Sequence, residues 1–308
     1  MSSSQTANNS AAGKGTKMSS LRSLFDFLRR QSIFSLLCLA IFLFLILAAI
    51  SAPWITPQNP YDNAQVDFFD ANLAPGTVSG DGRFVYLLGS DALGRDLYSA
   101  ILYGLRTSLS ISGTAALLAL AIGTLAGLAA AYFKGATDML IMRAVDIKLG
   151  FPTILVAMVI MSIFGAGYFN LVIALVLAQW PYYARTARSV ALVQIGQEYI
   201  EAARCLELPV HRLILVHLLP NSLPPLLVVF TLQLAHAAAI EASLSFLGLG
   251  VSIEAPSLGL LIANGSKEIL SGHSWQLIYP GLALVLLIFT VNIVGDRLRR
   301  ILNPKERG

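Results

Sequence analysis

Charged residues are scarce in this chain. Only 12% of its 308 residues are Asp, Glu, Lys or Arg, and 56% are hydrophobic. An ordinary soluble domain carries roughly 25% charged residues, so this composition argues against a water-soluble fold and predicts a membrane protein. Attraction to anionic inner-leaflet lipid accounts for the net charge of +4, and no nucleic-acid partner is expected.

Residue types that carry catalysis or bind metals are also few. Cys38 lies in an apolar run and Cys205 in a charged segment, so we expect no disulfide between them. No two of the four histidines stand four residues apart, which favours structural histidines over a metal or proton role. A phosphate-binding G-x-x-x-x-G-K-[ST] loop is missing. We therefore predict no metal site, no cofactor, no catalytic residues and no ATPase site in this chain.

The chain contains several long apolar runs. The first, Ile33–Ala52, is free of charge and has the roughly 20 residues that a helix needs to cross a bilayer core. Pro53 and Trp54 follow it where a signal peptide would have a small-residue cleavage site, so we interpret 29–55 as a retained transmembrane helix. The further runs are Ser108–Tyr132, Leu149–Phe164, Phe169–Tyr183, Leu223–Ile240 and Leu277–Val294. We predict an all-α membrane protein with six transmembrane helices.

Polar segments divide the chain and orient it. We interpret 1–28 as a disordered cytoplasmic tail, 56–106 as an extracytoplasmic loop region, 107–296 as a five-helix core with a cytoplasmic loop at 189–221, and 297–308 as a cytoplasmic tail. Most lysines and arginines fall on the side of the two termini. The exceptions are Arg83, Arg95, Arg106 and Lys267. By the positive-inside rule, both termini of this multi-pass protein are predicted to be cytoplasmic.

Two further patterns predict local structure. Gly123, Gly127 and Ala131 stand four residues apart within the second apolar run, a spacing that lets two helices approach closely. The polar segment Leu88–Asp96 precedes the same run. We interpret it as a capped turn that leads into the second span, rather than as an active site.

The segment Glu198–Asn221 is unusually charged for so apolar a chain. The positions i, i+3, i+4 and i+7, which share one narrow face of a helix, are occupied by Tyr199, Ala202, Ala203 and Leu206. Small side chains predominate on this face. Pro209 cannot continue this helix but can begin another, so we predict two short helices joined at Glu207–Leu208. Each charge would cost about 2.5–3.5 kcal/mol at the bilayer centre, which places the segment outside the membrane. An amphipathic loop lying on the membrane fits the pattern too, but the alanines favour packing against a protein.

The sequence Glu201-Ala202-Ala203, followed by Leu219-Pro220-Asn221, resembles the EAA loop of permease subunits from bacterial ATP-binding-cassette (ABC) importers. Other segments resemble the second permease subunit of the dipeptide, oligopeptide and nickel branch of that family, and the likeness covers roughly 29–304. These segments are Leu87–Leu109, Tyr132–Ile160, Glu241–Val251, Pro256–Gly265 and Pro280–Pro304. The resemblance implies the type I ABC importer permease fold and the bacterial inner membrane.

The same resemblance implies the function and the partners. The chain would form a translocation path with a homologous permease subunit, as a heterodimer. Two ATPase subunits would bind ATP and Mg²⁺, and an extracytoplasmic substrate-binding protein would deliver the solute. Di- or oligopeptides are the implied cargo, with nickel chelates or glutathione-like compounds as the alternative. A passive channel, which needs no ATPase, and a membrane-embedded enzyme are the rival classes.

The resemblance also implies which residues couple the chain to the ATPase, because the first short helix of the loop docks on that subunit in this family. The predicted coupling residues are Glu198, Tyr199, Glu201, Ala202, Ala203, Arg204, Leu206, Glu207, Leu219 and Pro220. The family usually has glycine where this chain has Glu207. Because a left-handed turn costs other residues about 1 kcal/mol, we expect either a differently shaped elbow or a Glu207 carboxylate near the start of the second helix.

Polar residues inside the predicted spans are candidates for the translocation path, since in lipid such residues usually face a partner or a cavity. The candidates are Gln233, Glu241, Ser245 and Asn292. For Glu241 we leave open a place at the outer headgroup boundary.

Overall fold

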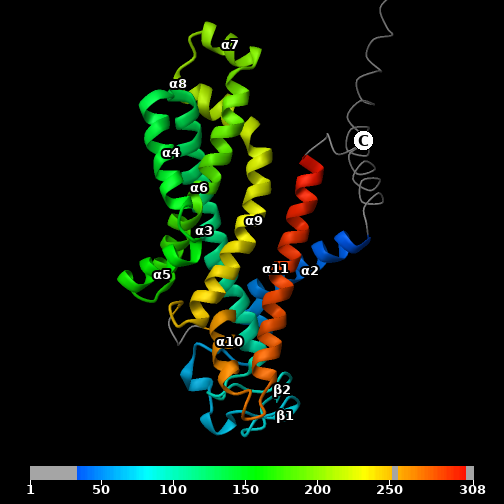
Figure 1. The fold of residues 1–308 in the computed structure, drawn as a ribbon. Coiled ribbons are helices and arrows are strands. Elements are labelled where there is room, and N and C mark those ends of the chain that lie inside the picture. Colours follow the sequence, from blue (N-terminus) through cyan, green and yellow to red (C-terminus); the bar gives the residue numbers. More distant parts are fainter. Residues whose placement is uncertain (1–32, 252–255, 303–308) are drawn as a thin grey trace, which may run out of the picture.

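A computed structural model describes residues 33–251 and 256–302, which form an elongated bundle of helices (Figure 1). The predicted tail 1–28 lies outside the described residues. The helices in chain order are α2 Ile33–Ile55, α3 Leu97–Phe133, α4 Gly135–Leu149, α5 Thr153–Phe164, α6 Tyr168–Ile195, α7 Glu198–Cys205, α8 Val210–Arg212, the π-helical segment η3 Leu213–Leu218, α9 Leu219–Phe246, α10 Leu258–Lys267 and α11 Trp275–Leu302. The predicted helical fold class is confirmed.

Most of the predicted spans are found as long apolar helices. Within the described residues, α2, α3, the continuous run Val210–Phe246 and α11 are each long and apolar enough to cross a membrane. The pair α4 and α5 makes a further span if the two are taken together. The 28-residue α6 is long enough as well, but it is less apolar because it carries amide and arginine side chains within the bundle.

The third predicted span, Leu149–Phe164, is not one straight helix. α4 ends at Leu149, and α5 has only 12 residues, about 18 Å of helix, which is too short to cross a bilayer core. The two helices meet at a bend of 91°. Pro152 has no backbone N–H and disfavours helical geometry in the residue before it, so the helix breaks there although the apolar run continues.

Two predicted boundaries are also corrected. The loop region was expected to extend to residue 106, but α3 begins at Leu97. The predicted capped turn is confirmed, because the Asp96 carboxylate accepts a hydrogen bond from the Ser99 N–H at 2.8 Å. At the other end of the chain, α11 runs to Leu302 and so enters the segment predicted as a tail, of which 303–308 lie outside the described residues.

The segment between α2 and α3 folds into a small cap at the end of the bundle opposite α7 (Figure 1). It contains the short helices η1 Asn63–Gln65 and η2 Phe68–Asp70 and an antiparallel pair of two-residue strands, β1 Thr77–Val78 and β2 Val85–Tyr86. The Tyr86 hydroxyl donates a hydrogen bond to the Asp70 carboxylate at 3.0 Å, which ties the strand pair to η2.

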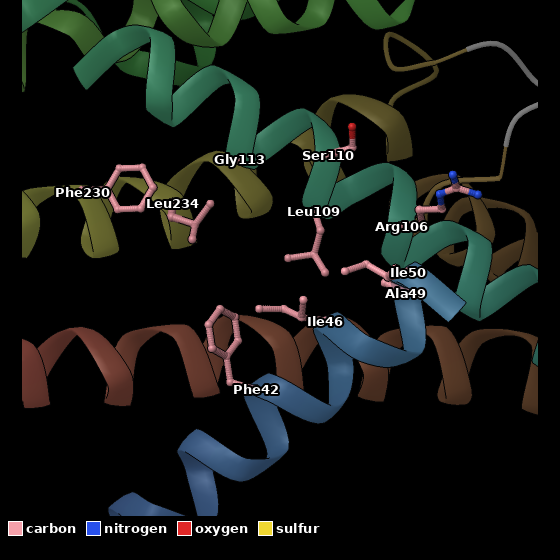
Figure 2. A pocket seen from close by; sticks show the side chains of 10 residues that line it. All are labelled: Phe42, Ile46, Ala49, Ile50, Arg106, Leu109, Ser110, Gly113, Phe230 and Leu234. Atoms are coloured by element: carbon pink, nitrogen blue, oxygen red, sulfur yellow. The ribbon is translucent and has the colours of Figure 1, made fainter. Parts of the chain in front are cut away.

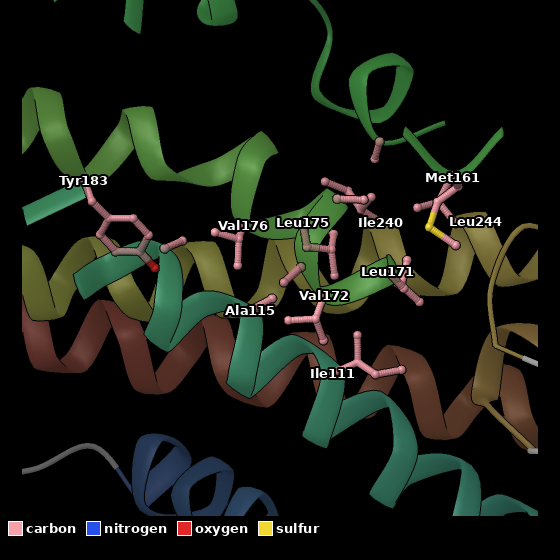
Figure 3. Close-up of a cluster of buried hydrophobic side chains, with 14 of the residues drawn as sticks. Ile111, Ala115, Met161, Leu171, Val172, Leu175, Val176, Tyr183, Ile240 and Leu244 are labelled. Atoms are coloured by element: carbon pink, nitrogen blue, oxygen red, sulfur yellow. The ribbon is translucent and has the colours of Figure 1, made fainter. Parts of the chain in front are cut away.

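The helices α3 and α6 pack closely, as the glycine spacing predicts. A Cβ added at Gly123 would lie 2.4 Å from the backbone oxygen of Trp180, and one at Gly127 would lie 2.3 Å from that of Ala184. Figure 3 shows the apolar core beside this contact, where side chains of α3, α6 and α9 such as Ile111, Leu175 and Ile240 meet. α2 packs on the outside of the bundle, against α3 and α11.

Candidate functional site

The helix α7 stands at one end of the bundle, next to the end of α6 (Figure 1). Glu198 and Glu201 lie in its first turn and Arg204 in its last turn. Acidic groups at the N-terminus and a basic group at the C-terminus both match the helix dipole, and each is worth about 0.3–1 kcal/mol. The local charge order therefore favours a helix at this place.

The two faces of α7 differ in what they contact. Ile200 is fully buried and Ala203 is 5% exposed, and both pack into a cluster with residues of α3, α6 and η3. Tyr199, Ala202 and Leu206 are exposed, Leu206 by 75% of its surface. The sequence predicts that Ala203 lies on the same face as Tyr199, Ala202 and Leu206. This is wrong, because Ala203 faces the chain's own core.

The exposed side of α7 is therefore the part that is free to contact another molecule. We call Tyr199, Ala202 and Leu206 the α7 outer face. Its edges carry the exposed carboxylates of Glu198 and Glu201. Sequence reasoning missed Ile200, whose i, i+3 spacing with Ala203 was the available signal for the inner face.

The elbow lies where it was predicted, at Glu207–Leu208, but its shape is not the one expected. Glu207 has φ of +52°, so it adopts the left-handed conformation that glycine would take. The Leu208 N–H bonds the Ala203 oxygen at 3.3 Å and the Glu207 N–H bonds the Arg204 oxygen at 2.9 Å, which is the Schellman pattern of a helix C-terminus. Both expectations for Glu207 are wrong: the turn is glycine-like, and the next helix begins only at Val210.

The predicted second short helix does not end at Leu219 or Pro220. α8, η3 and α9 run on from Val210 to Phe246 without a break. Leu213 and Leu218 are both buried at five-residue spacing, which puts them on one face of the π-helical turn. Pro220, in the first turn of α9, lies where the α-helical hydrogen bonding resumes, so the elbow is joined to a spanning helix without a loop between them.

A chain of hydrogen bonds holds α7 to its neighbours. The Tyr199 hydroxyl donates to the Gln194 side chain of α6 at 2.7 Å and accepts from the Asn221 amide of α9 at 3.2 Å. The Arg204 guanidinium lies 5.8 Å from the centre of the Tyr132 ring in α3, within range of a cation–π contact. These contacts connect α7 to three other helices, so a movement of α7 would displace α3, α6 and α9 together.

The same end of the bundle carries ion pairs between α4 and α6. Arg188 forms a bidentate pair with Asp138 at 2.5 and 2.6 Å, and Arg185 pairs with Asp146. Bidentate arginine–carboxylate pairs are the stronger and more directional kind. They fix the polar helix α4 against α6.

The predicted path residues do not converge on one place. Glu241 is fully buried, and its carboxylate accepts hydrogen bonds from Ser108 at 2.7 Å and from Ser245 at 2.8 Å. It faces neither lipid nor a headgroup layer, and it ties α9 to α3. Gln233 is 7% exposed, and its backbone oxygen accepts from the Gln179 amide at 3.2 Å.

Asn292 is partly exposed on α11. Within the chain itself, Gln233, Glu241 and Ser245 thus belong to the packed interior rather than to its surface. The described residues contain no group of three or more His, Cys, Asp or Glu side chains that could hold a metal.

Long apolar helices with a charged helix at one end of the bundle are typical of an integral membrane protein. The comparisons identify the family. Residues 123–308 match the family of binding-protein-dependent transport system inner membrane components, and residues 30–75 match the N-terminal transmembrane domain of oligopeptide transport permease C. The chain belongs to the binding-protein-dependent transport system inner membrane component family.

Relatives at higher identity cover most of the chain. It is 36% identical over 263 residues to the di/tripeptide transport system permease protein DppC of Pseudomonas aeruginosa, with 85% of each chain covered. It is 35% identical over 304 residues to the dipeptide transport system permease protein DppC of Escherichia coli K12, with 98% of this chain and 99% of that protein covered.

A solved structure shows the fold. The inward-facing MetNI methionine ABC transporter matches with a TM-score of 0.54 at 20% identity, over 66% of this chain and 96% of that chain. The core of the protein therefore has the type I ABC importer permease fold.

Proposed function

We propose that the chain is one of two different permease subunits of an ATP-driven importer of di- or oligopeptides. The observation that carries the coupling part of this proposal is the α7 outer face. Leu206 is 75% exposed beyond the membrane-spanning part of the bundle, on an elbow that holds a left-handed glutamate. Together with the exposed Tyr199 and Ala202, Leu206 forms a continuous strip, and a contiguous exposed apolar strip of this kind marks a surface for contact with another protein.

Two ATPase subunits, which bind the ATP and Mg²⁺, are the proposed partners of the permease pair, and one of them docks at this face. α7 presents an apolar strip bordered by Glu198 and Glu201, which suits a groove with basic edges. In this orientation the α7 end is cytoplasmic, and so are both chain termini. The cap between α2 and α3 then faces the outside, where a substrate-binding protein delivers the solute.

Peptide cargo is proposed from the relatives, whose names specify dipeptide and di/tripeptide transport. No observation favours nickel chelates or glutathione-like compounds. The absence of a metal-binding cluster among the described residues agrees with a cargo that is recognised chiefly by the binding protein.

Reconstitution of the purified complex tests the proposal. The chain is tagged and purified from membranes, and the complex is placed in liposomes with its binding protein and a radiolabelled dipeptide. We expect copurification of ATP-binding chains and uptake that requires ATP on the α7 side. Uptake without ATP would support the passive channel, and uptake of a nickel chelate but not of dipeptides would overturn the proposed cargo.

A further inference from the structure

An apolar groove lies on the outside of the bundle between α2, α3 and α9 (Figure 2). Its volume is about 340 Å³, within the range of about 300–1,000 Å³ that is usual for small-molecule sites. Phe42 and Ile46 line it from α2, Leu109 from α3, and Phe230 and Leu234 from α9. The groove belongs neither to the α7 outer face nor to the buried polar residues of the bundle.

One end of this groove is marked by an arginine. Arg106 of α3 is exposed, and Figure 2 shows its side chain at the end of the groove near Ala49 and Ile50, pointing away from the apolar residues. Across 33–251 and 256–302, no carboxylate forms an ion pair with it. Its guanidinium thus keeps five N–H donors in a fork that matches a phosphate.

Arg106 lies at the height along the bundle where lipid headgroups are expected. Ile50 lines the same end of the groove, and the apolar run of α2 ends a residue or two later. Trp54 follows on the next turn and is 79% exposed, as is typical of tryptophan at a membrane interface. From Ile50, α2 continues along the groove to Phe42, about 12 Å toward the middle of the bilayer.

We propose that this groove binds one acyl chain of a phospholipid whose phosphate is held by Arg106. The lipid belongs to the leaflet opposite α7. The apolar walls fit a chain of methylenes, and a chain bound there would run from Ile50 toward Phe42. The bound chain would fill the space between the peripheral α2 and the core helices, and the arginine would hold the headgroup by charge-assisted hydrogen bonds.

The chain offers matched variants for a test. Gly113 lines the groove, and a Cβ added there would meet no other atom within 4 Å. Gly113→Leu therefore fills the groove without displacing the backbone, and glycine is the weaker helix former of the two. Gly281 of α11 is equally open but does not line the groove, so Gly281→Leu is the control.

The experiment uses the assembled transporter in phosphatidylcholine vesicles. These contain phosphatidylglycerol with a photoactivatable diazirine in its acyl chain, and labelled positions are mapped by peptide mass spectrometry. We expect labelling of the groove walls in the wild type and in Gly281→Leu, and its loss in Gly113→Leu. Arg106→Gln is expected to reduce labelling roughly 10- to 150-fold, since a hydrogen bond to a charged group is worth about 1.5–3 kcal/mol, and Arg106→Lys to restore part of it.

A neutral diacylglycerol with the same diazirine tests the phosphate site at Arg106 separately from the acyl-chain groove. We expect it to label the groove weakly and without dependence on Arg106. Labelling as strong as that by phosphatidylglycerol would overturn the phosphate site. Equal labelling of wild type and Gly113→Leu, or no labelling of the groove in the assembled transporter, would overturn the lipid site and would favour a partner subunit as its occupant. Gel filtration verifies that each variant still assembles.

Discussion

Replacing Leu206 by aspartate should weaken docking of the ATPase without unfolding the chain. Leu206 is 75% exposed, so its removal costs the fold little, within about 0.5 kcal/mol as for other surface positions. Full burial of a leucine side chain is worth about 1.5–3 kcal/mol. Covering the exposed three-quarters then contributes about 1–2 kcal/mol, which corresponds to roughly a 5- to 30-fold change in Kd.

The assay is a titration of the purified ATPase subunits onto the permease pair in nanodiscs. Leu270 provides a matched control, since it is 99% exposed in the turn between α10 and α11. Because α10 lies at the end of the bundle opposite α7 (Figure 1), Leu270→Asp should leave the Kd unchanged. The reasoning would be refuted by a Leu206→Asp variant that assembles normally and binds the ATPase within twofold of the wild type. An equal loss in both variants would also refute it, because the effect would then be one of charge and not of position.

Further variants test separate features of the structure. Glu207→Gly removes the left-handed glutamate, which costs about 1 kcal/mol, so we expect α7 to exchange its amide hydrogens more slowly. Gly127→Leu places a side chain against backbone 2.3 Å away, and we expect loss of assembly on gel filtration. Glu241→Gln keeps an acceptor for the serine hydroxyls and should preserve the Tm, whereas Glu241→Leu leaves them unpaired and should cost about 1–3 kcal/mol. Burial raises the pKa of the Asp91 carboxyl, so the folded state holds this proton more tightly than the unfolded chain, whose pKa is about 3.9. Protease resistance of the cap should therefore fall as pH rises from about 4 through the raised pKa, and Asp91→Asn should remove that part of the pH dependence.

The parts of the fold that the sequence predicts are those whose signal is local. Uniform apolar runs such as Ile33–Ala52 identify α2 because each residue independently favours lipid over water. Apolar runs of this kind do not predict α4. It is a polar helix whose Asp138 and Asp146 are balanced by Arg188 and Arg185 of α6, and such pairing across helices leaves no periodic pattern within α4 itself.

The candidate site was predictable to a similar extent. The bounds of α7 and the position of its elbow follow from charge order and from Pro209, which act over a few residues. Which face of α7 is buried does not follow, because on a helix of 8 residues both faces carry small and apolar side chains. Only the contacts of Ile200 and Ala203 with α3, α6 and η3 decide the question.

One continuous helical run connects the elbow beside α7 with the opposite end of the bundle. Val210–Phe246 is one run of 37 residues, about 55 Å long, that begins beside the elbow and carries Glu241 near its far end. There the Glu241 carboxylate bonds Ser108 of α3, while α10 packs against the same helix. Because this run is continuous, it connects the elbow beside the α7 outer face with the α3–α9 contact at the far end of the bundle. The break that two separate short helices would have left is not found in this described part of the chain, so displacement of α7 acts directly on a spanning helix, which can bend at the π-helical turn Leu213–Leu218 and at Pro224–Pro225.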